Sequence, residues 1–186
     1  MDKRRYHHGS VRQDLVAAAL EALRTKPADT ISLRSLSRSI GVSATATYRH
    51  YQSKSDFMRE LSATGRKMLA QHVERHKNGL ANLGKAYLEF AIANPNLFGL
   101  MCEIAALGGQ ENGAELCQNA DACRSGNGGQ VRTGVGVIGI EAWALAYGLA
   151  RLVLEGRLDV AAAECVLEKY AQREMNRPGF VGGLNS

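Results

Sequence analysis

Apolar residues recur at helical spacing along most of the chain. Leu33, Leu36 and Ile40 lie at positions i, i+3 and i+7 of one short segment, which places them on one face of a helix. Similar stripes occur in four further segments, residues 15–23, 57–73, 80–93 and 97–107. The chain has only three prolines among many Ala, Leu and Glu residues, and this composition favours helix. The sequence therefore predicts an all-α fold.

Residues 32–54 carry the clearest boundaries between helices. Ser32 is a candidate N-cap for the helix that contains the Leu33 stripe, and Gly41 stands where a helix usually ends, because glycine adopts positive φ without steric cost. Ser43 can cap a second helix over residues 44–50, and Ser53 a third. Two short helices joined by a tight glycine turn are the pattern of a helix-turn-helix.

The second short helix has small residues at its start and polar residues at its end. A small residue such as Ala44 lets a helix N-terminus lie deep in the major groove of DNA. Thr45 and Arg49 are four apart and share a face that can reach base edges. The alternative is a solvated polar surface helix. We predict DNA contacts from nine residues, namely Ser32, Arg34, Ser43, Ala44, Thr45, Tyr48, Arg49, His50 and Lys54.

The charge of the chain is divided unequally along its length. Residues 1–54 hold ten Lys/Arg and four Asp/Glu, a net charge of +6, whereas residues 55–186 hold thirteen and fourteen, a net charge of −1. This asymmetry suits a DNA-binding head on a near-neutral body. We predict a DNA-binding domain over residues 1–54, including a basic N-terminal arm, and a helical regulatory and dimerisation domain over residues 55–186.

The string GVSATATYRHYQSK resembles the helix-turn-helix of the tetracycline-repressor (TetR) family of bacterial transcription regulators. The upstream strings YHHGSVRQDLVAAALEAL and ISLRSLSRSIG resemble the first two helices of that family. One departure is Tyr51, where the family often has Phe. The resemblance implies a homodimeric repressor, neither an enzyme nor dependent on a cofactor, that a small-molecule effector releases from a palindromic operator.

The later strings YLEFAIANPNLFGLM and EAWALAYGLARLVLEGRLD resemble a form of the family's regulatory domain. By this resemblance, the helices at about 138–155 and 160–175 form the dimer surface, with four helices from two subunits. Four small residues permit close helix approach, either between subunits or within one subunit's core: Ala142, Ala146, Gly148 and Ala150.

A ligand pocket is expected among the remaining helices of the body. Its candidate residues are Met68, Tyr87, Phe90, Phe98, Met101, Cys102, Trp143 and Tyr147. Aromatic and Met residues at helical spacing are also what a plain hydrophobic core contains. The sequence does not indicate the polarity of the ligand.

Two alternatives come from other functional classes. An architectural DNA-binding protein without an effector would not need so large a body. A helical metal or redox protein would use His72, His76 and the four cysteines, Cys102, Cys117, Cys123 and Cys165. However, no CxxC pair is present, and Val73 stands where a zinc-protease helix needs Glu. We therefore expect the two histidines to be exposed on a connecting helix and predict no metal.

The remaining features complete the expected architecture. Glycine-rich residues 108–134 are interpreted as loop around a possible short helix, and residues 135–140 as the start of a helix. No run of eighteen apolar residues is present, and the N-terminus has no apolar signal region. The expectation is a cytoplasmic protein with no membrane partner.

Overall fold

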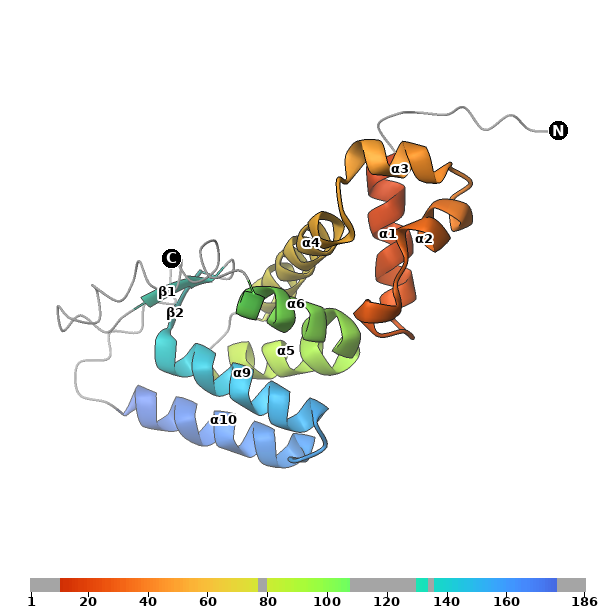
Figure 1. The fold of residues 1–186 in the computed structure, drawn as a ribbon. Helices are drawn as coiled ribbons and strands as arrows, with labels where there is room; N and C mark the ends of the chain where they lie inside the picture. Colours follow the sequence, from red (N-terminus) through yellow and green to blue (C-terminus); the bar gives the residue numbers. More distant parts are fainter. Residues whose placement is uncertain (1–10, 77–79, 108–129, 134–135, 177–186) are drawn as a thin grey trace. The chain divides into compact units, whose positions relative to one another are not determined.

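The computed structural model describes residues 11–76, 80–107, 130–133 and 136–176 (Figure 1). The chain forms two compact units, and each is described by itself. The first unit comprises residues up to Gly65 together with Asn96–Ile104, and the second comprises Arg66–Pro95 and the chain from Ala105 onward. The sequence places a boundary after residue 54, whereas the first unit continues to Gly65.

The first unit is built from short helices and parts of two longer ones. In chain order these are α1 (Val11–Leu23), the 3-10 helix η1 (Ala28–Thr30), α2 (Leu33–Ser39), α3 (Ala44–His50), the beginning of α4 (Lys54–Glu74) and most of α6 (Pro95–Leu107). Helix α1 buries every fourth residue, Val11, Leu15, Ala19 and Leu23, as a single helical stripe should.

The turn between α2 and α3 follows from its glycine. Gly41 has φ +74°, and the next N–H, of Val42, donates to the Ser37 carbonyl at 2.9 Å, which closes a Schellman turn. Ser43 then caps α3, because its side chain accepts a hydrogen bond from the Ala46 N–H at 3.1 Å. The predicted helix-turn-helix is confirmed, including the bounds of its second helix.

The other two predicted caps have different outcomes. Ser53 precedes α4, where its Oγ accepts the Asp56 N–H at 3.1 Å and its O–H donates to Asp56 Oδ2 at 2.8 Å. The bond from Ser53 is the main reason that the pKa of Asp56 lies below its ordinary value. Ser32 stands at the N-cap of α2, as predicted, but its side chain makes no capping bond.

The second unit is a layer of packed helices. Helix α5 (Leu80–Ala93) lies beside α9 (Ile140–Leu154) and α10 (Val160–Met175) (Figure 1). Helices α5 and α10 approach closely at Gly84, where an added Cβ would lie 2.6 Å from Leu167 Cδ2. A side chain at this position would require the end of the Leu167 side chain to shift. This packing brings residues 80–93 and 160–175 of the second unit together.

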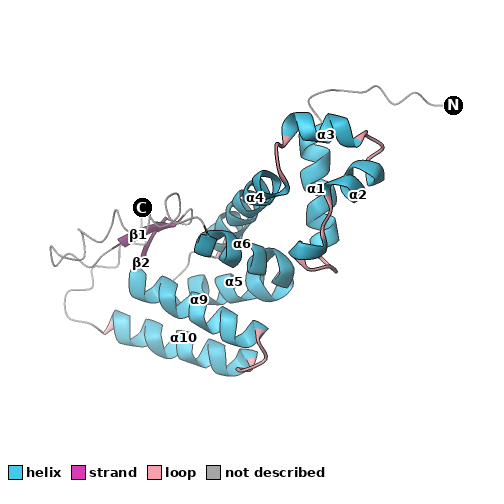
Figure 2. Cartoon of the chain, viewed as in Figure 1, coloured by secondary structure: helices cyan, strands magenta, loops and turns pink. Residues whose placement is uncertain are grey.

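A two-stranded antiparallel sheet precedes α9 (Figure 2). Strands β1 (Gln130–Thr133) and β2 (Gly136–Gly139) pair with Gln130 opposite Gly139. Two expectations are therefore wrong: residues 130–133 are not loop, and residues 136–139 form a strand, so the helix begins only at Ile140. Val137 and Ile138 are β-branched and favour a strand over a helix. Helices nevertheless dominate the described residues, and the predicted fold class is confirmed.

The small residues of α9 divide between two roles. Ala142, Ala146 and Ala150 are buried, with 8%, 5% and 0% of their surface exposed, so they face the core of their own unit. Gly148 differs, because a Cβ added there would meet nothing within 4 Å. Of the four residues, only Gly148 opens onto space outside that core.

Candidate DNA-binding interface

The outer face of α3 is polar and accessible. Thr45, Arg49 and His50 are exposed, and Tyr48 has 53% of its surface exposed. No ion pair involves Arg49 or the exposed Arg34 of α2 within the described part of the chain. These cationic groups are therefore available to bind phosphate or base edges.

The inner face of α3 contains a buried polar contact. Ser37 of α2 and Thr47 of α3 have 1% and 0% of their surface exposed, and their hydroxyl oxygens are 2.6 Å apart. Ser37 also donates to the Leu33 carbonyl at 2.6 Å. Sequence reasoning missed this pair. Its available signal was the position of Ser37, four residues after Leu33 and therefore on the face that packs into the core.

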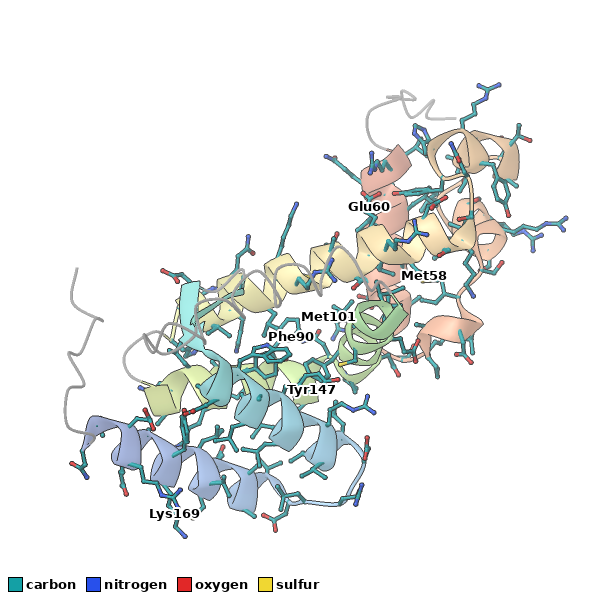
Figure 3. All side chains as sticks on the ribbon, turned by 60° about the vertical axis from the view of Figure 1, so that its left-hand side comes forward. Met58, Glu60, Phe90, Met101, Tyr147 and Lys169 are labelled. Atoms are coloured by element: carbon teal, nitrogen blue, oxygen red, sulfur yellow. The ribbon has the colours of Figure 1, made fainter. Side chains whose placement is uncertain are left out.

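A second contact joins three elements of the first unit. Arg12 of α1 donates through Nε to both carboxylate oxygens of Glu60 of α4, at 2.8 and 2.9 Å. Its guanidinium also lies 5.8 Å from the ring centre of Tyr51, which follows α3. The Tyr51 ring packs edge-on against Phe57 at 4.9 Å between centres. Figure 3 labels Glu60 in this part of α4. The cluster fixes the end of α3 against α1 and α4.

The environment of Tyr51 changes its acidity. Only 3% of its surface is exposed, and burial is the main reason that its pKa rises to about 12, with Glu60 contributing in the same direction. The phenol is therefore neutral over the physiological range of pH. Glu60 in turn raises the pKa of Arg12, so the guanidinium is charged.

Lys54, a predicted phosphate ligand, has a partner within the protein. Its Nζ donates to the Asp29 carbonyl at 2.7 Å, at an exposed site. An ammonium group has three donors, so this bond leaves two for phosphate. All nine residues predicted to contact DNA lie in the first unit, and their contacts with DNA stay a prediction.

The residues predicted to line a ligand pocket are divided between the two units. Met68, Tyr87, Phe90, Trp143 and Tyr147 belong to the second unit, and Phe98, Met101 and Cys102 to the first. Phe98 has 1% of its surface exposed and Met101 7%, so both belong to the first unit's core. Figure 3 labels Phe90, Met101 and Tyr147.

Trp143 and Tyr147 form an aromatic pair on α9. Their rings are stacked, 5.4 Å between centres and 17° from parallel, and both residues are half-buried. A planar ligand group can stack on such rings. A pocket beside this pair stays a prediction.

The two histidines of α4 have different environments. His76 is exposed, as expected, but His72 is half-buried, with its Nε2 3.6 Å from a Glu89 carboxylate oxygen of α5. Among the described residues, no three His, Cys, Asp or Glu side chains are gathered to hold a metal ion. Cys102 and Cys165 form no disulfide bond within the described part of the chain, while Cys117 and Cys123 lie outside the described residues.

The first unit has the geometry of a helix-turn-helix DNA-binding domain: a Schellman turn, a capped second helix and an exposed basic face. Residues 15–61 match the family described as bacterial regulatory proteins, tetR family. The protein is a DNA-binding transcription regulator with a tetR-family DNA-binding domain. No helix in the described part of the chain is long and apolar enough to span a membrane.

One solved structure resembles nearly the whole chain. It is described as the structure of a protein with unknown function from Rhodococcus sp. RHA1, and it shares 27% sequence identity with a TM-score of 0.64. The match covers 92% of this chain and 96% of that one. No curated protein sequence matches the chain significantly. The similarity supports the fold of both units and adds no ligand.

The raised pKa of Tyr51 predicts a specific loss of stability in alkali. Between about pH 10, the ordinary pKa of tyrosine, and about 12, the unfolded chain releases the Tyr51 proton while the folded chain retains it. Stability contributed by Tyr51 is therefore complete below pH 10 and decreases as the pH rises through this window. Tyr51→Phe should show a shallower decrease in urea-unfolding free energy between pH 10 and 12.

The matched control is Tyr48→Phe, which removes the same group from an exposed ring and should retain the wild-type profile. An identical decline in Tyr51→Phe and the wild-type protein would contradict the assignment of this stability to Tyr51.

Proposed function

We propose that the protein is a homodimeric repressor that binds a palindromic operator through α3 and is released by a small-molecule effector. The observation that carries the DNA-binding part is the face of α3. This face presents exposed Thr45 and Arg49 from a helix whose N-terminus is capped by Ser43. Base edges of the major groove are read by such side chains, and arginine to guanine is the commonest specific contact.

The proposed dimer is supported by apolar side chains exposed on α10. Val160, Val166 and Met175 have 40%, 39% and 63% of their surface exposed, while Gly148 of α9 has open space beside it. One helix-turn-helix makes few base contacts, and two related by a two-fold axis read two half-sites about 34–36 Å apart. A dimer through α9 and α10 would supply both heads and could cover Val166, which lies on a different side of α10 from Val160 and Met175.

The proposed effector response is supported by the continuity of α4. This single helix has residues 54–65 in the first unit and residues 66–74 in the second. A ligand changes the affinity for DNA only if it binds one arrangement of the units better than another. Binding against the Trp143–Tyr147 stack would place the effector in the second unit, where α4 ends.

Sequence-specific DNA binding is tested by selecting duplexes from a random library with the full-length protein. We expect a palindrome with strongly salt-dependent affinity. Arg49→Ala should change which bases are preferred, whereas Lys54→Ala should weaken all sites alike and lower the salt slope by about 1. Lys67→Ala removes the same charge from an exposed position of the second unit, outside the proposed dimer surface, and serves as control. Recovery of no palindrome would contradict the proposal.

Dimerisation is tested at Gly148. Gly148→Leu places a bulky side chain in the space beside α9, so it should separate the subunits and reduce operator affinity. Gly148→Ala adds only a methyl group and should retain the dimer. Analytical ultracentrifugation measures the state of each variant. A wild-type monomer at micromolar concentration, or a Gly148→Leu dimer of wild-type strength, would contradict this interface.

Effector coupling is tested through Trp143, the only tryptophan of the chain. Candidate ligands are titrated against its fluorescence, with and without the selected operator. Typical couplings of about 1–3 kcal/mol correspond to a change of about 5- to 150-fold in affinity, and the change must be reciprocal. A ligand that quenches Trp143 and binds equally well in both titrations would exclude this mechanism. Operator binding unaffected by every ligand would favour an architectural role.

A further inference from the structure

The buried contact between α2 and α3 is directional. Ser37 has a single hydroxyl hydrogen, and it donates this hydrogen to the Leu33 carbonyl at 2.6 Å. The bond between the hydroxyls of Ser37 and Thr47, also 2.6 Å long, must therefore be donated by Thr47. The two hydrogen bonds therefore run in one direction, from Thr47 of α3 to Ser37 and from Ser37 to the Leu33 carbonyl of α2. Each hydroxyl donates its one hydrogen in this series.

We propose that Ser37 and Thr47 are positioning residues that set the rotation of α3 about its own axis, and thereby its base preference. Hydrophobic contacts are non-directional, whereas a hydrogen bond weakens steeply when its angle changes. A hydroxyl bond at the centre of the α2–α3 contact therefore constrains rotation in a way that apolar packing does not. This inference rests on the proposed reading of bases by α3.

The position of Thr47 on the helix makes it effective in this role. Successive residues of an α-helix are about 100° apart around its axis, so Thr45 and Arg49 each project about 160° away from Thr47. The bond thus lies opposite the predicted DNA-reading face. A rotation of about 10° moves a side-chain atom about 6 Å from the axis by about 1 Å. Such a shift is enough to misalign a bidentate contact with a base.

Four variants separate positioning from simple stability. Thr47→Val removes the hydroxyl with little change of shape and leaves a Ser37 lone pair without its donor. Ser37→Ala leaves the Thr47 hydroxyl without its acceptor on α2. The double variant Ser37→Ala/Thr47→Val removes both polar groups, and removal of both partners is often nearly neutral for stability. Thr47→Ser retains the hydroxyl and is the matched control.

The experiment compares full-length variants that are folded by circular dichroism at one temperature. The probes are the duplex selected by the wild-type protein and a shuffled duplex of equal length and composition. We expect the double variant to keep wild-type thermal stability, shuffled-duplex affinity and salt slope. Its ratio of specific to shuffled affinity should fall about 10-fold or more, and selection with it should give an altered base preference. Thr47→Ser should retain the wild-type ratio.

Each outcome has a distinct meaning. A double variant with the wild-type ratio and base preference would overturn the inference and reduce the pair to a packing contact. If this variant does not fold, the same comparison is made with Thr47→Val and Ser37→Ala, and wild-type specificity in both would overturn the inference. Failure of the wild-type protein to prefer any sequence would instead refute the proposed function.

Discussion

The DNA-binding unit depends on contacts that hold two very short helices. Helices α2 and α3 have seven residues each, and isolated helices of that length are not stable in water. Their orientation must therefore come from outside themselves. The Gly41 turn limits the angle between them, the Ser37–Thr47 bond joins their buried faces, and the Arg12–Glu60–Tyr51 cluster secures the end of α3. The positions of the exposed residues of α3 therefore depend on these contacts.

The Arg12–Glu60 pair shows why position matters more than charge in this unit. The side chain of Arg12 is 61% exposed, and exposed ion pairs add little to stability because solvent screens them. However, both Nε and Nη2 of Arg12 contact the Glu60 carboxylate, and the same guanidinium lies against the ring of Tyr51. Its main effect is therefore geometric, because it relates α1, the end of α3 and α4 to one another.

Local chemistry was predictable from the sequence, and contacts across the fold were not. Gly41, Ser43 and Ser53 act within a few residues of themselves, so their positions in the sequence were enough to predict a turn and two caps. Ser37 and Thr47 are ten residues apart, and their contact requires knowledge of how two helices pack. The strands β1 and β2 were missed for a different reason: their partners lie only three to nine residues apart, but the glycines around them are typical of a loop, and β2 runs directly into the helical pattern of α9.

The boundaries of the two compact units could not be predicted from the distribution of charge along the sequence. Net charge changes near residue 54, but the first compact unit includes residues 55–65 and 96–104. These residues belong to α4 and α6, each of which is one unbroken helix. Because the transitions after residues 65 and 104 fall inside these helices, no linker in the sequence marks them. For the same reason, the sequence did not indicate that the residues predicted to line one pocket belong to two units.

The close approach at Gly84 links the residues that can be accepted at positions 84 and 167. A Cβ at position 84 would lie 2.6 Å from Leu167 Cδ2, so the side chain of Leu167, which is 4% exposed, would have to shift. The two positions are therefore not free to vary independently. A residue larger than glycine at 84 is therefore easier to accommodate when the residue at 167 is smaller than leucine.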